Sequence, residues 1–134
     1  MVFLRSVVLL FCAVAFACTA SHTHGNDSTT GTKGKLRFVE QSYNFGRLRQ
    51  GDVVGHRFKV FNEGIAPVTI QAVDKACGCT DVIYPKKPIL GGDSAFVEVV
   101  FDSNGWNGRQ VKRVALTAND SIRVHELLIW AEIK

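Results

Sequence analysis

Two cysteines separated by one glycine are the residues of this sequence whose types and spacing best suit chemistry. They are Cys77 and Cys79, in the stretch ACGCT. Thiols this close can form a disulfide if the chain bends between them, and Gly78 adopts backbone angles that other residues avoid. Two thiolates also suit soft metal ions such as Cu(I) or zinc. A third interpretation treats them as small apolar side chains packed at the end of a strand.

A disulfide at this place would be a weak structural support. It would close a loop of three residues, for which the loop-entropy relation gives about 1.6 kcal/mol, against about 3 kcal/mol for fifteen residues. A bridge that stabilises so little is more labile, and labile disulfides are the regulatory or redox-active ones. Thiol redox chemistry at Cys77 and Cys79 is therefore one prediction, and metal binding and plain packing remain open beside it.

Further metal ligands are scarce in the sequence. A closed zinc site usually has four ligands, and the chain has no second closely spaced cysteine pair. His56 and His125 are the histidines of the predicted folded part, and each falls in an alternating pattern typical of strands. We expect both side chains to be partly buried and hydrogen-bonded rather than bound to metal, and we expect no cofactor.

Residues 1–17 have the pattern of a secretory signal peptide, with a cation at Arg5, an apolar run and small residues at the end. The run is shorter than the roughly 20 apolar residues that span a bilayer. Cys18 follows directly, as the cysteine does in a bacterial lipobox, which predicts a lipid on its thiol. The alternative is ordinary cleavage after Ala17, which leaves Cys18 free. With two acyl chains, the protein would be anchored to a membrane of the cell envelope, on its periplasmic or cell-surface face.

Residues 18–34 are rich in Ser, Thr, Gly and His. They can bury little surface, so we predict that they form a flexible tether beginning at the lipidated cysteine. Residues 35–134 remain for a folded domain, which suffices for one hydrophobic core. The net charge of the chain is +4, but its basic residues are scattered. Nucleic acid binding needs a clustered basic face, so we exclude nucleic acid as a partner.

Short runs with a period of two predict an all-β domain. In the run HRFKVFN, for example, one face carries Arg57, Lys59 and Phe61. Turns rich in Gly, Asn, Asp and Pro separate the runs. The pattern and length predict an immunoglobulin-like antiparallel β-sandwich of about seven strands. The clearest runs span residues 36–40, 56–62, 67–73, 95–101, 110–118 and 122–133.

The order of short motifs in the folded part resembles a bacterial domain-of-unknown-function family marked by Cys-Gly-Cys-Thr. The resemblance covers nearly all of that part and implies an immunoglobulin-like sandwich similar to Hydin-type and major-sperm-protein domains, often on secreted or lipid-anchored proteins. It implies no reaction. Gly91–Gly92 departs from the pattern, where the family usually has Pro-Gly, and this predicts a looser turn. The matching motifs are Phe45–Gly46, Gly51–Asp52, Asn62/Gly64/Pro67, Cys77–Thr80, Pro85/Pro88, Phe101–Asp102 and Thr117/Asn119.

These observations predict a lipid-anchored binding or assembly module without catalytic activity. Its loops and strand edges would contact an unidentified envelope or surface protein. Trp106, in NGWNG, is a candidate for that contact, because an aromatic side chain at a loop tip favours partner binding. The alternative places its ring back over the edge of the sandwich. The alternative function is an extracytoplasmic thiol-redox or Cu(I)-handling protein that uses Cys77 and Cys79.

Overall fold

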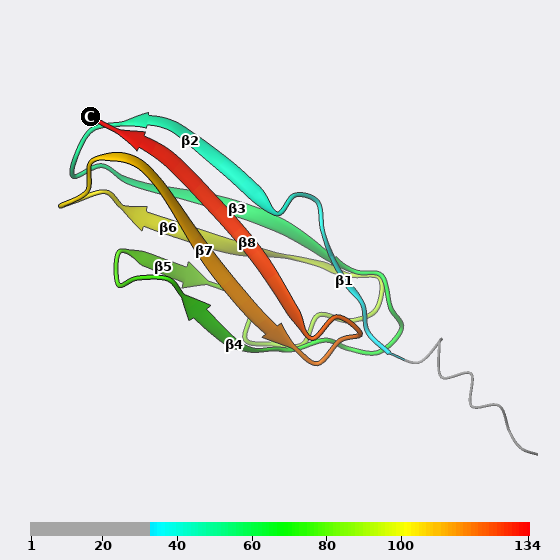
Figure 1. Ribbon diagram of the computed structural model, residues 1–134. Helices are drawn as coiled ribbons and strands as arrows, with labels where there is room; N and C mark the ends of the chain where they lie inside the picture. The colour runs from blue at the N-terminus through cyan, green and yellow to red at the C-terminus, as the bar shows by residue number, and fades with distance from the viewer. Residues whose placement is uncertain (1–32) are drawn as a thin grey trace, which may run out of the picture.

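The computed structural model describes residues 33–134, which form eight strands in two sheets packed face to face (Figure 1). The predicted signal peptide 1–17, the lipidation site Cys18 and the tether up to residue 32 lie outside the described residues. The strands are β1 (Leu36–Phe38), β2 (Ser42–Leu48), β3 (Val53–Asn62), β4 (Ile70–Lys75), β5 (Thr80–Ile83), β6 (Ser94–Asp102), β7 (Gly108–Ala118) and β8 (Val124–Ile133).

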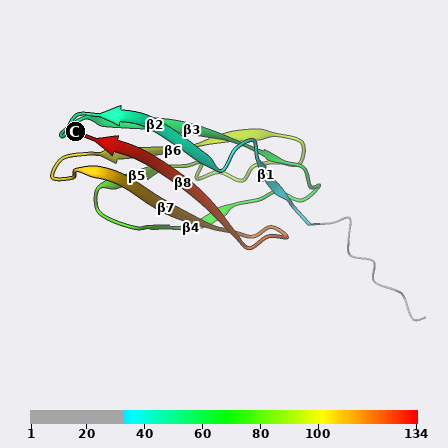
Figure 2. The same cartoon turned by 45° about the horizontal axis from the view of Figure 1, so that its top comes forward.

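The first sheet has the strand order β1-β3-β6-β5, and the second has the order β2-β8-β7-β4. All neighbours are antiparallel except β2 and β8, which run parallel. The predicted all-β, immunoglobulin-like sandwich is confirmed, with eight strands where about seven were expected. Figures 1 and 2 both place the end of β8 at the opposite end of the sandwich from residue 33, where the described chain begins.

The sequence patterns did not predict β2 and β5, and in each strand the reason is local. In β2 the pairing with β8 shifts between Asn44 and Arg47, and Gly46 has a φ of 74°, so the alternation of side chains is broken. The other strand, β5, has only four residues and begins directly after the two cysteines. A run this short carries too little periodicity to be recognised.

The core forms because side chains alternate between the interior and solvent along the longer strands. In β8, every second residue from His125 to Ile133 is buried. Full burial of one large apolar side chain contributes about 1.5–3 kcal/mol. Both sheets supply the buried cluster, whose largest fully buried apolar members are Phe58, Phe101, Leu116, Leu127, Ile129, Val60, Val68, Val97, Val99 and Val114.

Asn62, the last residue of β3, joins several chain segments through its amide group. Its Oδ1 accepts hydrogen bonds from the backbone N–H groups of Lys35, at 3.1 Å, and Gly64, at 3.0 Å. Its Nδ2 donates to the backbone oxygens of Ala66, at 2.8 Å, and Ile89, at 2.9 Å. The side chain is 1% exposed. The Asn-x-Gly-x-x-Pro motif therefore has a structural role, which is to fix the loop after β3.

Gly91 packs against the same loop. A Cβ atom at this position would lie 2.5 Å from the backbone oxygen of Ile65 and 2.7 Å from that of Gly64. Backbone atoms cannot yield as a flexible side chain can, so the close approach requires glycine here. The departure at Gly91–Gly92 thus accompanies a tight contact between two loops rather than the looser turn that the sequence suggested.

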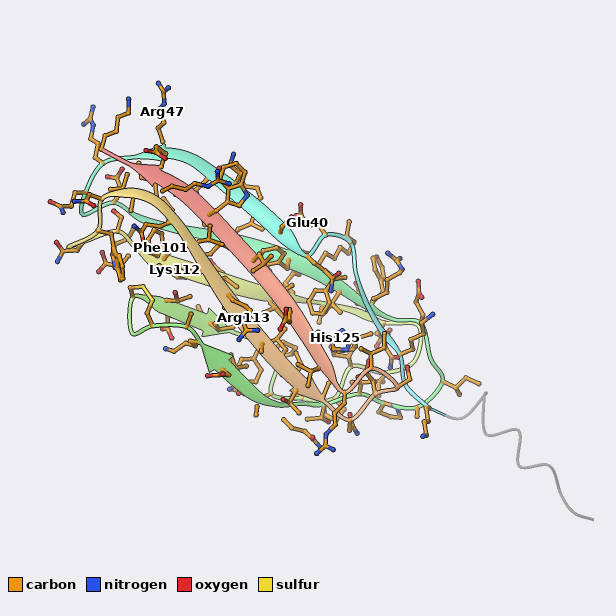
Figure 3. The ribbon with its side chains drawn as sticks, viewed as in Figure 1. Glu40, Arg47, Phe101, Lys112, Arg113 and His125 are labelled. Carbon is orange, nitrogen blue, oxygen red and sulfur yellow. A yellow bond between two sulfur atoms is a disulfide. The ribbon has the colours of Figure 1, made fainter. Side chains whose placement is uncertain are left out.

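The two histidines of the described chain are buried or half-buried and hydrogen-bonded, as predicted. His125 is buried, and its Nε2–H donates to Asp120 Oδ2 at 2.9 Å. Figure 3 places it toward the end at which the described chain begins. His56 is half-buried, donates to Glu40 Oε1 at 2.7 Å and stacks on Tyr43 with ring centroids 3.5 Å apart.

Candidate functional site

The two cysteines lie in the turn that carries the chain from one sheet to the other. β4 is an edge strand of the second sheet and β5 is an edge strand of the first. The turn begins where Ala76 N–H donates to the backbone oxygen of Arg113 on β7, at 3.2 Å. An ion pair of 3.4 Å between Lys75 Nζ and Asp81 Oδ1 spans it. In Figures 1 and 2 the turn lies toward the end of the sandwich far from residue 33.

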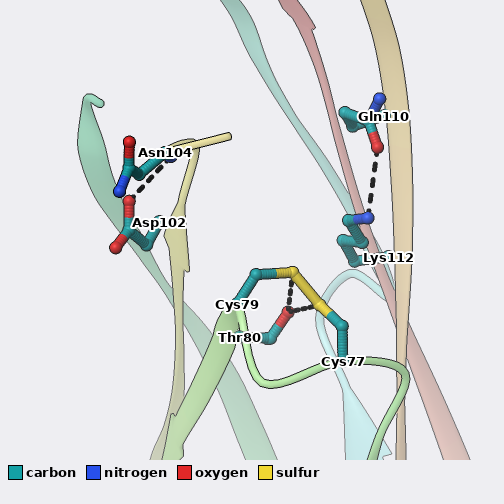
Figure 4. The surroundings of a disulfide bond; sticks show 7 residues. All are labelled: Cys77, Cys79, Thr80, Asp102, Asn104, Gln110 and Lys112. Atoms are coloured by element: carbon teal, nitrogen blue, oxygen red, sulfur yellow. Dashed lines mark hydrogen bonds between the residues drawn. A yellow bond between two sulfur atoms is a disulfide. The ribbon is translucent and has the colours of Figure 1, made fainter. Parts of the chain in front are cut away.

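Cys77 and Cys79 are joined by a disulfide, with their Cα atoms 5.2 Å apart (Figure 4). Both cysteines are half-buried, whereas Gly78 between them is exposed. The hydroxyl of Thr80 is 3.5 Å from Cys77 Sγ and 3.8 Å from Cys79 Sγ. Cys79 packs against the core cluster. In this oxidised form the pair has no thiolate, and its roles in redox chemistry and metal binding stay predictions.

A buried lysine lies beside the disulfide. Lys112 on β7 comes directly before Arg113, whose backbone oxygen accepts from Ala76 N–H, and two residues before Val114, the register partner of Lys75. Figure 4 shows its side chain between the disulfide and Gln110, whose Oε1 accepts a hydrogen bond from Lys112 Nζ at 3.1 Å. Lys112 is 8% exposed, and burial lowers the pKa of its ammonium group below the ordinary 10.5.

Sequence reasoning missed Lys112, although a signal was present. Along β7 the alternation puts Lys112 on the same inward face as Val114 and Leu116. When a charged residue falls on the buried side of a predicted strand, either the predicted alternation is wrong there or the charge is buried. A buried charge is rare unless it has partners. Here the partners are Gln110 on the same strand and a residue of the loop before β7.

Trp106 supplies one of those partners. Its ring centroid is 3.3 Å from Lys112 Nζ, a short cation–π contact. Trp106 is half-buried and packs against the core cluster, and its backbone N–H donates to the backbone oxygen of Ser103 at 3.1 Å. The ring therefore folds back over the end of the sandwich, which was the alternative geometry in the sequence analysis. Its role in contacting a partner stays a prediction.

The lowered pKa of Lys112 makes stability depend on pH. Between that pKa and 10.5 the unfolded chain binds more protons than the folded one, so the free energy of unfolding rises with pH. We expect the free energy of unfolding of oxidised wild-type protein to rise with pH relative to that of Lys112→Met in that window, measured by urea unfolding. The exposed Lys87→Met serves as control and should track the wild type. A constant difference between wild type and Lys112→Met up to pH 10.5 would contradict the assignment.

A second candidate surface lies on the outer face of the first sheet, where cations and aromatic rings alternate. Arg57 Cζ is 4.3 Å from the ring centroid of Phe96. Lys59 Nζ is 4.9 Å and Arg37 Cζ is 5.2 Å from the ring centroid of Phe61. We call these five residues, contributed by β1, β3 and β6, the cation–aromatic face. Phe96 is 42% exposed.

The charge of this face is partly balanced at one end. Glu63 accepts a hydrogen bond from Arg37, which holds the pKa of that carboxyl below its ordinary 4.5. Among the described residues, Arg57 and Lys59 form no ion pair. The alternation in the sequence of β3 predicts that Arg57, Lys59 and Phe61 point outward. That β1 and β6 lie beside β3 is known only from the structure.

Neither a cluster of metal ligands nor a membrane-crossing helix is present in residues 33–134. No group of three or more His, Cys, Asp or Glu side chains in this part is arranged to hold a metal ion. None of its segments is a helix with the length and apolar character needed to cross a membrane.

Comparison with known proteins gives a family and a fold. Residues 36–133 match the family described as "Protein of unknown function (DUF1573)". No curated protein matches the chain. Among solved structures, a protein of unknown function from Porphyromonas gingivalis W83 is 16% identical, with a TM-score of 0.67 over 81% of this chain and 51% of its own. The chain thus spans about half the length of that protein.

Two further structures show the same fold. The seventh PapD-like domain of human CEP192, an ASH / PapD-like domain, is 9% identical, with a TM-score of 0.61 over 78% of this chain and 87% of its own. The secreted serine protease VesC from Vibrio cholerae is 13% identical, with a TM-score of 0.58 over 81% of this chain and 25% of its own. At these identities the likeness concerns the fold alone. The Cys-Gly-Cys-Thr signature as a mark of the family stays a prediction.

Proposed function

This chain belongs to the DUF1573 family of proteins of unknown function, and from that premise we propose that it is an extracytoplasmic, lipid-anchored binding module without catalytic activity. Its partner is an envelope or surface protein that docks on the cation–aromatic face. The observation that carries the proposal is the run of three cations over two aromatic rings on β1, β3 and β6.

The chemistry of this face suits a protein interface. Arginine and aromatic side chains are enriched where binding energy concentrates in such interfaces. A cation held over a ring keeps a favourable electrostatic contact when a partner removes water from it. Phe96 is 42% exposed beside Arg57, so apolar area of its ring remains for a partner to bury.

The charge of the face indicates the chemistry of the partner. Arg57 and Lys59 lack carboxylate partners among the described residues. Carboxylates on a partner would pair with them and steer its approach. We therefore infer that the partner presents acidic side chains, with apolar ones positioned for Phe61 and Phe96.

In this proposal the lipid on Cys18 holds the module at a membrane, and residues 18–33 form the tether. Gly34, the last residue of the tether expected from sequence, is instead buried against the sandwich, where its backbone oxygen accepts from Ser121 N–H at 3.1 Å. A flexible chain of that length has an end-to-end distance of about 20–25 Å. The module would then sample the layer just above the lipid headgroups, with its outer faces free to meet neighbours. The intact mass of membrane-purified protein tests this part, because a mass without the diacylglycerol would remove the anchor from the proposal.

The binding proposal is tested by recovery of partners from the cell's own membrane fraction on immobilised full-length chain. The double variant Arg57→Ala/Phe96→Ala should reduce the recovered partner at least tenfold, since each residue loses hot-spot contacts. The matched control is Arg109→Ala/Trp130→Ala. It removes a pair of the same kind, with Arg109 Cζ 5.1 Å from the Trp130 ring centroid, from the outer face of the second sheet.

Recovery that survives in the control and is lost in the test variant supports the proposed face. Equal recovery with both variants, or loss only in the control, would place binding elsewhere and defeat the proposal. Both double variants lie on exposed or half-exposed positions, so thermal unfolding of each should stay close to the wild type and exclude a folding defect as the cause.

A further inference from the structure

We propose that the Cys77–Cys79 disulfide is a thiol–disulfide exchange site that oxidises the dithiol of a partner protein, and that Lys112 stabilises the thiolate released in the exchange. This inference is independent of binding at the cation–aromatic face, and the exchange is stoichiometric, one partner dithiol for each bridge, so it does not make the module a catalyst. It takes up the alternative function from the sequence analysis and gives it a direction, a substrate class and a further residue.

The disulfide is placed where a partner can reach it. It lies in a turn between two edge strands, and the exposed Gly78 leaves the turn uncovered on one side. Both cysteines are half-buried rather than enclosed. The bridge closes a ring of three residues, so its oxidised form gains little from loop closure. A structural disulfide of a secreted domain is ordinarily harder to reduce than such a bridge.

The surroundings favour a thiolate once the bridge opens. Lys112 brings an ammonium group into the protected end of the sandwich, in the surroundings of the disulfide (Figure 4) and capped by the ring of Trp106. A neighbouring cation lowers the pKa of a thiol, and the effect is stronger where water is excluded. The Thr80 hydroxyl, in contact with both sulfurs, donates a hydrogen bond to either one when it becomes anionic.

The exchange balances as two displacements. A thiolate of the partner attacks Cys77 Sγ, which packs less against the core than Cys79 does. The Cys77–Cys79 bond breaks, a mixed disulfide forms with Cys77, and Cys79 leaves as a thiolate beside Thr80. The second thiolate of the partner then attacks its own sulfur in the mixed disulfide, which releases Cys77 as a thiolate. The partner loses two electrons and becomes a disulfide, while this chain gains two electrons and, with two protons from solvent, becomes a dithiol.

The equilibrium is measured on the full chain with reduced and oxidised glutathione as the probe, followed by acid quench, alkylation and mass analysis. Trypsin releases residues 76–86 as one peptide that contains only this cysteine pair, so Cys12 and Cys18 do not interfere. We expect the wild-type bridge to be reduced by excess glutathione. In Lys112→Met, at least threefold more reducing conditions should be needed for half reduction, because the thiolate loses its cation.

Two variants control for packing and folding. Lys112→Arg keeps the charge and should restore the wild-type midpoint, and the exposed Lys87→Met should not move it. With Cys79→Ser, the remaining Cys77 should form a stable mixed disulfide with oxidised glutathione, since the resolving thiol is gone. A bridge that resists excess glutathione, a Lys112→Met midpoint equal to that of Lys87→Met, or a Cys77 that forms no mixed disulfide would each overturn the proposal.

Discussion

Replacing Asn62 by alanine is expected to lower the free energy of unfolding by about 3–4 kcal/mol. The side chain makes four hydrogen bonds to backbone groups from three segments of the chain, and it is almost fully buried. Each bond contributes about 0.5–1.5 kcal/mol, and a buried group left without a partner costs about 1–3 kcal/mol. The loss is measured by urea unfolding at pH 7, with the disulfide intact in both proteins.

Asn119→Ala is the matched control for this prediction. Its Oδ1 accepts one hydrogen bond, from Thr69 N–H at 2.7 Å, and the residue is exposed. Water replaces an exposed hydrogen bond at little cost, so the loss should stay below about 1 kcal/mol. If both variants lost the same free energy, the amide of Asn62 would not be the device that holds the loop after β3.

Asp120→Ala is expected to cost about 2–3 kcal/mol and to loosen β1. The carboxylate is fully buried, and its Oδ2 accepts hydrogen bonds from His125 Nε2–H and from the backbone N–H of Leu36, each at 2.9 Å. Alanine leaves both donors without an acceptor in a buried place. Amide hydrogen exchange should show faster opening at residues 36–38 than in the wild type, beside the global loss seen in urea.

The control for this prediction is Asp81→Ala. Its carboxylate is 77% exposed, pairs with Lys75 across the cysteine turn and accepts an exposed hydrogen bond from the backbone N–H of Val82 at 3.1 Å, and exposed pairs are worth about 0–1 kcal/mol. Hydrogen exchange at residues 36–38 should not change. Unaltered exchange of β1 in Asp120→Ala, despite a loss of global stability, would show that the carboxylate does not hold this strand.

The sheets were predictable from sequence to the extent that alternation was clean. β3, β6, β7 and β8 alternate between a more buried and a more exposed residue over nine or more positions, which is long enough for the period of two to stand out. The bulge in β2 and the short length of β5 hid those strands. The parallel pairing of β2 with β8 depends on contacts distant in sequence, which no local pattern contains.

The candidate sites divide in the same way. The cysteine pair was found because its two members are adjacent in the sequence. Lys112 comes near the pair because β7 is paired with β4 in the sheet. Trp106 comes near it because the loop after β6 brings its ring against Lys112. The charge of Lys112 argued for a solvent-facing position, although its phase in β7 placed it inside. Of the cation–aromatic face, the sequence predicted only the part on β3, where Arg57, Lys59 and Phe61 share the outward side.

The placement of β8 has a consequence for protein synthesis. β8 is the last of the eight strands in chain order, yet it lies in the middle of its sheet, between β2 and β7. Ser42 is the register partner of Leu128, so β2 leaves the ribosome long before the strand that will hold it. Until then Tyr43 and Phe45 have no sheet to join. The second sheet therefore closes only when β8 has emerged, and topologies with such distant pairings fold slowly, over milliseconds to seconds. Until then the domain is an unclosed sandwich available to holding chaperones.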